Sequence, residues 1–238
     1  MSEVVPRATR RIGHKGADHI APGNTLASFD AGLAAGVDMI EFDVLSEHED
    51  GTGRLLLAHD YRDAARRTPL ELEEGLAHFA SDAYAGVELD VDLKRAGYED
   101  RVVAALRAHG LAERGLISTM ETASLARLRE LAPEIRLGWS VPRVRRNYLA
   151  HPATRLLALA AIVYARRVLP PRLVAAIRAG EIEAVMAHWS LVNAGFWAAI
   201  REAGGELYVW TVDDAERIAE LEALGVTGII SNDPRLFG

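Results

Sequence analysis

The sequence predicts an α/β fold in which eight strand–helix units close into a parallel (β/α)8 barrel, the TIM-barrel architecture. Three observations support this fold class. Short β-like runs alternate with helical patterns along the chain, which is typical of parallel sheets. If the run at 55–59 forms a hairpin with the strand before it, eight units remain, and 238 residues is a usual length for eight. Nearly every expected strand also ends on a polar or aromatic residue, as barrel strands do where they line an active site.

The expected elements follow in chain order. The strands are short apolar runs at 11–13, 39–45, 55–59, 87–93, 115–119, 135–139, 184–188, 207–211 and 228–231. The helices carry apolar residues at intervals of three and four and span 25–35, 69–81, 98–109, 122–131, 153–178, 193–203 and 214–224. Glycines at 36, 110 and 225 stand where helices would end, and 190–193 and 213–214 look like N-caps. The pair Pro170-Pro171 is expected to break its helix.

The composition narrows the possible function classes. Half of the residues are apolar and 26% are charged, which argues against global disorder. The net charge of −7 argues against a general nucleic-acid binder. Because cysteine is absent, the chain has no disulfide, no zinc ribbon and no thiol nucleophile. A doubly wound sheet, the alternative fold, would call for a glycine-rich phosphate loop after the first strand, and the sequence has none there.

The sequence shows no signal for export or membrane insertion. Residues 1–11 lack the apolar core of a secretory signal, and no apolar run approaches the roughly 20 residues that a membrane span needs. Cytoplasmic residence is therefore expected. We find no low-complexity linker and no tandem repeat, so residues 1–238 are expected to form one domain.

Carboxylates gather at the ends of two expected strands. Glu41 and Asp43 are two residues apart, so on a strand they point to one face, where they repel each other unless a cation or proton lies between them. Apolar and charged residues alternate in the next barrel strand, and Asp92 lies on its charged face. Such oxygen ligands suit Mg²⁺ or Ca²⁺. The alternatives are a solvated strand end with one arginine partner or, for Glu88 and Asp90, an internal stack of salt bridges.

Two histidines and two lysines fall beside these carboxylates. His14 and His59 each end an expected strand, and histidine is suited to proton transfer near neutral pH. The 27 basic residues include only two lysines, Lys15 and Lys94, and both fall in the expected site. An ammonium group can approach a phosphate oxygen as a point charge. Together these residue types indicate phosphoryl transfer, with a metal ion to neutralise charge and an acid–base pair to move protons.

These candidate residues lie within motifs spread over the whole chain. The motifs are I-G-H-K-G at 12–16, A-P-G-N-T-L-A-S-F at 21–29, G-V-D-M-I-E-F-D-V at 36–44, L-A-H-D at 57–60, D-L-K at 92–94, V-W-T-V-D at 209–213 and G-V-T-G-I-I-S-N-D-P at 225–234. In this order and spacing they resemble the glycerophosphodiester phosphodiesterase family. The resemblance implies a TIM barrel that uses a divalent metal ion. By position it implies catalytic roles for His14 and His59, metal ligation by Glu41, Asp43 and Asp92, and substrate contacts for Lys15, Lys94 and Trp210.

The chain departs from the family's pattern at three places. The family usually carries Pro-Glu-Asn-Thr where this chain has Pro-Gly-Asn-Thr, so Gly23 leaves one acidic group of the site missing. The family's lid insertion is nearly absent, because only about ten residues separate His59 from the next expected helix, and this opens the pocket. Asp92 stands where the family usually has Glu, and its D-x-K spacing with Lys94 resembles the related sphingomyelinase D family.

The resemblance implies hydrolysis of a small-molecule glycerophosphodiester to glycerol phosphate and an alcohol by two-histidine acid–base catalysis. In this family the substrate's own neighbouring hydroxyl can be the nucleophile, giving a cyclic phosphate first. Two alternatives stay open. A phospholipase D-like activity on lysophospholipids or sphingolipids is suggested by Asp92. A non-catalytic barrel that binds phosphate or lipid is suggested by Gly23.

An arginine-rich segment is the remaining feature. Residues 135–180 hold nine arginines and no acidic residue, and the part at 143–178 is also rich in apolar residues. One interpretation is an ordinary barrel helix whose arginine stems cover its edges. The other is a basic amphipathic surface that attracts anionic lipid headgroups and gives the protein a peripheral contact with a membrane.

Overall fold

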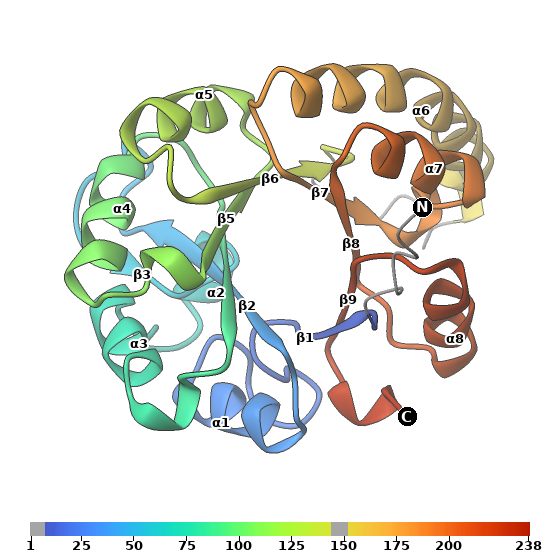
Figure 1. The fold of residues 1–238 in the computed structure, drawn as a ribbon. Coiled ribbons are helices and arrows are strands. Elements are labelled where there is room, and N and C mark those ends of the chain that lie inside the picture. The colour runs from blue at the N-terminus through green and yellow to red at the C-terminus, as the bar shows by residue number, and fades with distance from the viewer. Residues whose placement is uncertain (1–7, 144–151) are drawn as a thin grey trace, which may run out of the picture.

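The computed structural model describes residues 8–143 and 152–238, which form a barrel of parallel strands enclosed by helices (Figure 1). The strands are β1 (Arg10–Gly13), β2 (Met39–Ser46), β3 (Leu55–Leu56), β4 (Glu88–Leu93), β5 (Gly115–Thr119), β6 (Arg136–Val141), β7 (Ala184–His188), β8 (Glu206–Trp210) and β9 (Gly228–Ser231). The helices are α1 (Leu26–Ala34), α2 (Tyr61–Ala64), α3 (Leu72–Phe79), α4 (Glu99–Ala108), α5 (Thr122–Leu131), α6 (Pro152–Arg178), α7 (Ala194–Glu202) and α8 (Ala215–Leu224).

The strands close on themselves in a single ring. Their order is β1-β9-β8-β7-β6-β5-β4-β2, all parallel, and β1 pairs with β2 to complete the ring. The remaining strand, β3, is added antiparallel to the end of β2. Both the expected (β/α)8 barrel and the expected hairpin are therefore confirmed.

Side chains point alternately outward and inward along each strand, so the apolar ones form two separate cores. On β4, Leu89, Val91 and Leu93 are buried in the large cluster between the strands and the surrounding helices. A second cluster fills the inside of the barrel and consists of Ile12, Met39, Leu116, Ala184, Met186, Tyr208 and Ile230. Because side chains alternate across a strand, Asp90 and Asp92 are left to face the inside.

Ion pairs occupy the end of the barrel where the strands begin. Glu88, the first residue of β4, pairs with Arg10 at 2.8 Å and also with Arg136. The salt-bridge interpretation of Glu88 is thus confirmed. Asp90 differs, since among the described residues it has no ion pair. Its burial, with the nearby charge of Asp92, raises its pKa to about 8, so that it holds a proton at neutral pH.

Local sequence signals set several helix ends. Thr25 caps α1 through a capping box with Ser28. Asn193 and Asp214 cap α7 and α8 by accepting a hydrogen bond from a backbone N–H in the first turn. Gly225 ends α8 in the left-handed conformation, with φ of 74°, as glycine does at helix C-termini. The caps at Asn193, Asp214 and Gly225 agree with the expectation from sequence.

Two local predictions are wrong at the end of the hairpin and in the arginine-rich segment. The run at 55–59 is a strand only over Leu55–Leu56, and the short helix α2 follows it. Asp60 starts α2 by accepting a hydrogen bond from the N–H of Asp63 at 2.8 Å, which turns the chain away from β2.

The second wrong prediction is the helix break at Pro170 and Pro171, because α6 continues through both. The φ of proline is compatible with a helix, and each proline removes only one backbone hydrogen bond. Leu173 is buried, and Leu169 and Ile177 pack against the main apolar cluster, so side-chain packing on both sides of the prolines holds the helix together.

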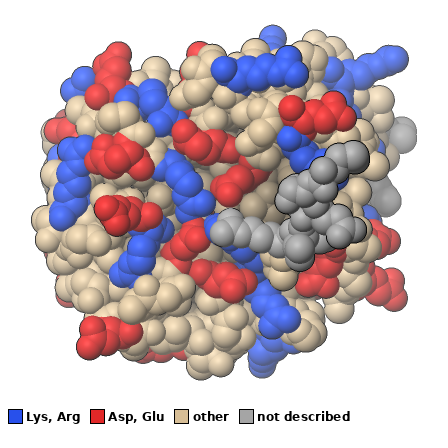
Figure 2. Space-filling model, viewed as in Figure 1, with Lys and Arg blue, Asp and Glu red and all other residues tan. Residues whose placement is uncertain are grey.

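The surface carries charges of both signs. Figure 2, viewed as in Figure 1, shows acidic and basic side chains interspersed on this face of the molecule. This face therefore lacks the broad basic stripe that attracts nucleic-acid phosphates. Within residues 8–143 and 152–238, none of the helices combines the length and apolar character that crossing a membrane requires.

Candidate active site

Three carboxylates meet at the C-terminal ends of β2 and β4. The parallel register pairs Asp43 with Asp92 and Glu41 with Asp90, so acidic side chains of both strands share the mouth of the barrel. Glu41, Asp43 and Asp92 each offer an oxygen within 4.8 Å of the others. Glu41 and Asp43 are buried, whereas Asp92 is partly exposed. The structure thus brings together the three residues that the sequence predicts as metal ligands.

Burial and mutual repulsion make this cluster costly to ionise. Burial raises the pKa of Glu41 well above its ordinary value, and the charge of Asp43 raises it further. Burial also raises the pKa of Asp92. The pKa of Asp43 is lowered instead, because the charge of Lys94 and other nearby cationic groups outweigh its burial. A further cation among these oxygens would relieve the remaining repulsion.

Lys94 lies between two of the carboxylates. Its ammonium group forms ion pairs with both Asp43 and Asp92. Burial alone would lower the pKa of Lys94, but the charges of these two carboxylates raise it well above its ordinary value. Lys94 is therefore a permanent positive charge at the cluster, and 18% of its side chain remains exposed toward solvent.

The loop between β1 and α1 wraps around the carboxylates. The backbone N–H of Lys15 donates to Oε2 of Glu41 at 2.8 Å. The side chain of Asn24 donates to Oδ2 of Asp43 at 2.8 Å and accepts from the Asp43 backbone N–H at 3.0 Å. Lys15 and Asn24 both have positive φ angles, 50° and 58°, which are strained for residues other than glycine. The strain coincides with the contacts that orient the two buried carboxylates.

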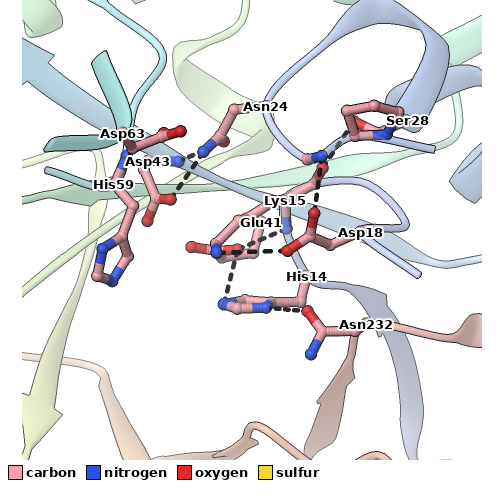
Figure 3. Close-up of polar contacts among 12 residues, drawn as sticks. His14, Lys15, Asp18, Asn24, Ser28, Glu41, Asp43, His59, Asp63 and Asn232 are labelled. Atoms are coloured by element: carbon pink, nitrogen blue, oxygen red, sulfur yellow. Dashed lines mark hydrogen bonds and ion pairs between the residues drawn. The ribbon is translucent and has the colours of Figure 1, made fainter. Parts of the chain in front are cut away.

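A chain of hydrogen bonds orients His14. Its Nδ1 lies 2.5 Å from Oδ1 of Asn232, and its Nε2 lies 3.8 Å from Oε2 of Glu41 (Figure 3). Asn232 uses its amide nitrogen to donate to Asp213 at 2.7 Å, which leaves its oxygen to accept from His14. The proton of the neutral ring is therefore on Nδ1, and Nε2 carries the free lone pair. Burial, reinforced by the charge of Lys15, lowers the pKa of His14 to about 4, so the ring is neutral at neutral pH.

His59 lies on the other side of the cluster, just after β3. Its side chain is 54% exposed, and its Nδ1 is 3.5 Å from Oδ2 of Asp60. Its backbone N–H donates to Asp63 at 3.2 Å, which ties the residue to the first turn of α2. Figure 3 shows the His59 ring beside Asp43, away from His14. The two predicted catalytic histidines therefore flank the carboxylates from different sides.

Trp210 ends β8 and forms part of the barrel wall. Its indole N–H donates to the carbonyl of Met186 at 2.9 Å, and its ring meets that of His188 edge-on, with 5.2 Å between the ring centres. It packs against the apolar cluster inside the barrel. With the N–H occupied, only a ring face is left for other contacts, and its contact with substrate stays a prediction.

Sequence reasoning missed the polar residues that orient this site. Asn24, Asp213 and Asn232 lie inside the motifs used to assign the family, so the motifs were the available signal. Their roles depend on pairings across long stretches of chain, such as that of His14 with Asn232, which are 218 positions apart. Asp18, which contacts Lys15, lies between two motifs and had no sequence signal.

Comparisons with known proteins agree with this architecture. A glycerophosphodiester phosphodiesterase of Caldanaerobacter subterraneus subsp. tengcongensis is 23% identical over 265 residues, covering 94% of this chain and 93% of the relative. The solved glycerophosphodiester phosphodiesterase of Agrobacterium tumefaciens has a TM-score of 0.69 at 20% identity, covering 96% of this chain and 97% of that one.

A second solved structure is an Oleispira antarctica phosphodiesterase in complex with the product sn-glycerol-3-phosphate. It has a TM-score of 0.69 at 21% identity and covers 96% of this chain and 94% of its own. The family model described as "Glycerophosphoryl diester phosphodiesterase family" matches residues 14–68 and 80–236. Because this match spans most of the sequence, the chain belongs to the glycerophosphoryl diester phosphodiesterase family.

Proposed function

We propose that this chain is a metal-dependent phosphodiesterase that hydrolyses glycerophosphodiesters to glycerol phosphate and an alcohol. The observation that carries the proposal is the convergence of Glu41, Asp43 and Asp92 at one end of the barrel, with His14 and His59 beside them. Family membership and the product bound by the Oleispira antarctica relative support the same substrate class. The pairing of β1 with β9 supports a single such domain over the whole sequence.

The donor set fits a hard divalent cation such as Mg²⁺ or Ca²⁺. All three candidate ligands, Glu41, Asp43 and Asp92, are carboxylates. Oδ1 of Asp43 is buried and accepts no well-aligned hydrogen bond, although it lies against the ammonium of Lys94. When bound, the ion would neutralise part of the charge of the substrate phosphate.

The surroundings of the two histidines support different roles. His14 is neutral and has Nε2 free, so it suits a general base that takes the proton from the attacking hydroxyl of water or of the substrate itself. As the new phosphorus–oxygen bond forms, the bond to the alcohol breaks, and His59 gives a proton to the leaving alkoxide. Lys15 and Lys94 add positive charge for the phosphate, and Trp210 offers its ring face to the substrate.

The first prediction concerns the histidines. His14→Ala and His59→Ala should each lower kcat for a glycerophosphodiester by about 10²–10⁴-fold, because each removes one proton transfer. The matched control is His109→Ala, since His109 pairs with Glu73 away from the site and should leave kcat unchanged. Steady-state kinetics on purified variants measure the effect. A folded His14→Ala variant with full activity would sink the assignment.

The second prediction concerns metal binding and pH. Burial and repulsion from Asp43 raise the pKa of Glu41, so a divalent ion competes with a proton for this carboxylate. Calorimetry with Mg²⁺ and Ca²⁺ should show proton release on binding, and the affinity should rise with pH. Glu41→Gln should remove most of the pH dependence, and EDTA should abolish hydrolysis.

The absence of both metal binding and turnover would favour the non-catalytic alternative. A protein that binds neither ion and turns over no diester in a panel of substrates would be a phosphate- or lipid-binding barrel. Affinity independent of pH, with turnover intact, would instead contradict only the protonated state assigned to Glu41.

A phospholipase D-like activity on lysophospholipids is the second candidate function. It is favoured by Asp92 and Lys94, which form a direct ion pair in the D-x-K spacing that resembles sphingomyelinase D. The connection after His59 is short and contains only the four-residue α2 before α3, in agreement with the expected loss of the family's lid insertion.

The third prediction separates these two substrates. Glycerophosphocholine and lysophosphatidylcholine both release choline, so one choline assay compares them directly. We expect kcat/KM to be at least about tenfold higher for glycerophosphocholine, because the proposed site recognises the glycerol phosphate and gains little from an acyl chain. The reverse ratio would assign the enzyme to the lysophospholipase D class.

We also propose that α6 makes a peripheral contact with anionic membranes. Its 27 residues exceed the nine and ten residues of α1 and α4. Among the side chains described on α6, at 159–178, the large apolar ones that are exposed are Leu159, Val163 and Tyr164, at 45%, 61% and 68%. Arg167 and Arg172 are exposed on the same helix. Apolar side chains next to arginines favour the headgroup region of an anionic bilayer.

Part of the arginine-rich segment serves the fold instead. Arg136 pairs with Glu88 inside the barrel, Arg143 pairs with Glu121, and Arg166 donates to the carbonyl of Ser190 at 2.7 Å. Residues 144–151 of the segment lie outside the described residues. The membrane proposal therefore depends on α6 and not on the total charge of 143–178.

The fourth prediction tests this surface. The protein should sediment with vesicles that contain phosphatidylglycerol, and Val163→Ser/Tyr164→Ser should reduce the bound fraction several-fold, because it removes apolar area that enters the headgroup region. Leu26→Ser is the control, since Leu26 is an exposed apolar residue on α1. Equal binding by both variants, or no binding by the parent protein, would argue against a membrane contact.

A further inference from the structure

In the loop between β1 and α1, the side chain of Asp18 occupies the space that a side chain at position 23 would need. Gly23 stands where the family's pattern has Glu, and a Cβ built on Gly23 would lie 2.6 Å from Oδ1 and 2.8 Å from Cγ of Asp18. It would also lie 2.9 Å from Cβ of Lys15. Contacts this short do not occur, so a side chain at 23 cannot coexist with the present position of Asp18. The carboxylate of Asp18 fills the volume where a side chain at 23 would begin.

Asp18 makes two contacts from this position. Its Oδ1 accepts a hydrogen bond from the backbone N–H of Gly23 at 2.8 Å. Its Oδ2 forms an ion pair with Nζ of Lys15 at 3.5 Å. Backbone hydrogen bonds from Ile20 and Ala21 to the carbonyl of Ala17, at 2.8 and 3.0 Å, form the turn that brings Asp18 back to Gly23.

Both partners of Asp18, Lys15 and Gly23, connect to the residues that hold the carboxylate cluster. The residue after Gly23 is Asn24, whose side chain holds Asp43 by two hydrogen bonds. The backbone of Lys15 holds Glu41, and its ammonium group is close enough to affect the ionisation of Asp43. Asp18 thus holds one end of each of these two loop segments, and Figure 3 shows it beside Lys15 and Glu41.

We propose that Asp18 replaces, from five positions earlier in the same loop, the acidic side chain that the family carries at position 23. In this role it is a positioning residue. It holds the Gly23–Asn24 bend against Asp43, and it keeps the ammonium of Lys15 from pairing with the carboxylates that would bind the metal ion. The proposal deepens the proposed function and depends on it only for the identity of the metal ligands.

A double-mutant cycle tests the exchange. The variants are Asp18→Ala, Gly23→Glu and Asp18→Ala/Gly23→Glu, with Glu222→Ala on the exposed face of α8 as a control for loss of one negative charge. Alone, Gly23→Glu should lower the melting temperature, because its side chain meets Asp18. In the Asp18→Ala background the same substitution should lower it by much less, because only the contact with Cβ of Lys15 remains. This non-additivity is expected only if the two positions share one space.

Metal affinity is the second readout. Calorimetry with Ca²⁺ and Mg²⁺, without substrate, should show about tenfold weaker binding for Asp18→Ala and recovery in the double variant, as for residues that orient metal ligands. Asp18→Asn keeps the acceptor for the N–H of Gly23 but loses the charge. It should keep the melting temperature and still weaken metal binding.

The outcomes distinguish this proposal from the proposed function. Additive losses in the double variant, in melting temperature and in affinity, would overturn the exchange whatever the enzyme hydrolyses. Non-additive melting temperatures with no turnover of any diester would support the exchange and reject the activity. Unchanged metal affinity in Asp18→Asn would leave Asp18 with a purely structural part in the loop and overturn its role at the metal site.

Discussion

The electrostatic repulsion among the carboxylates at the barrel mouth is the constraint on which the site depends. Glu41 and Asp43 are buried at hydrogen-bonding distance from groups of the first loop, and Asp92 lies next to them. Buried like charges are unfavourable unless cations or hydrogen-bond donors compensate them. The ammonium of Lys94 and the side chain of Asn24 provide part of this compensation. The strained backbone of the loop positions the N–H of Lys15, which donates to Glu41.

The two ends of the barrel differ in how their charged side chains are paired. Where the strands begin, Glu88 is matched by Arg10 and Arg136, so the charges balance and that end serves stability. Where the strands end, Asp43 and Asp92 pair with Lys94, while burial raises the pKa of the neighbouring carboxyls of Glu41 and Asp90. Buried carboxyl groups that are costly to ionise, at one end of an otherwise ion-paired interior, are typical of a site that binds a cation.

Periodicity along the sequence is sufficient to predict the barrel, its orientation and most of the charged cluster. Residues two apart on a strand share a face, so the pattern predicts that Glu41 and Asp43 point to the interior whatever their neighbours are. The orienting contact of His14 could not be found in this way, because it depends on the pairing of β1 with β9 and on the turn after β9. Local rules failed at Pro170 and Pro171, where packing outweighs the lost hydrogen bonds.

Asn232 follows the last strand of the barrel, and this position has a consequence for folding during synthesis. His14 follows the first strand and is among the first groups of the site to be synthesised, whereas Asn232, which orients its ring, follows the last strand. Until β9 has been synthesised, β1 has only one of its two neighbours, and the His14 ring lacks the partner that orients it. The contact between His14 and Asn232 therefore forms only with the closure of the ring of strands.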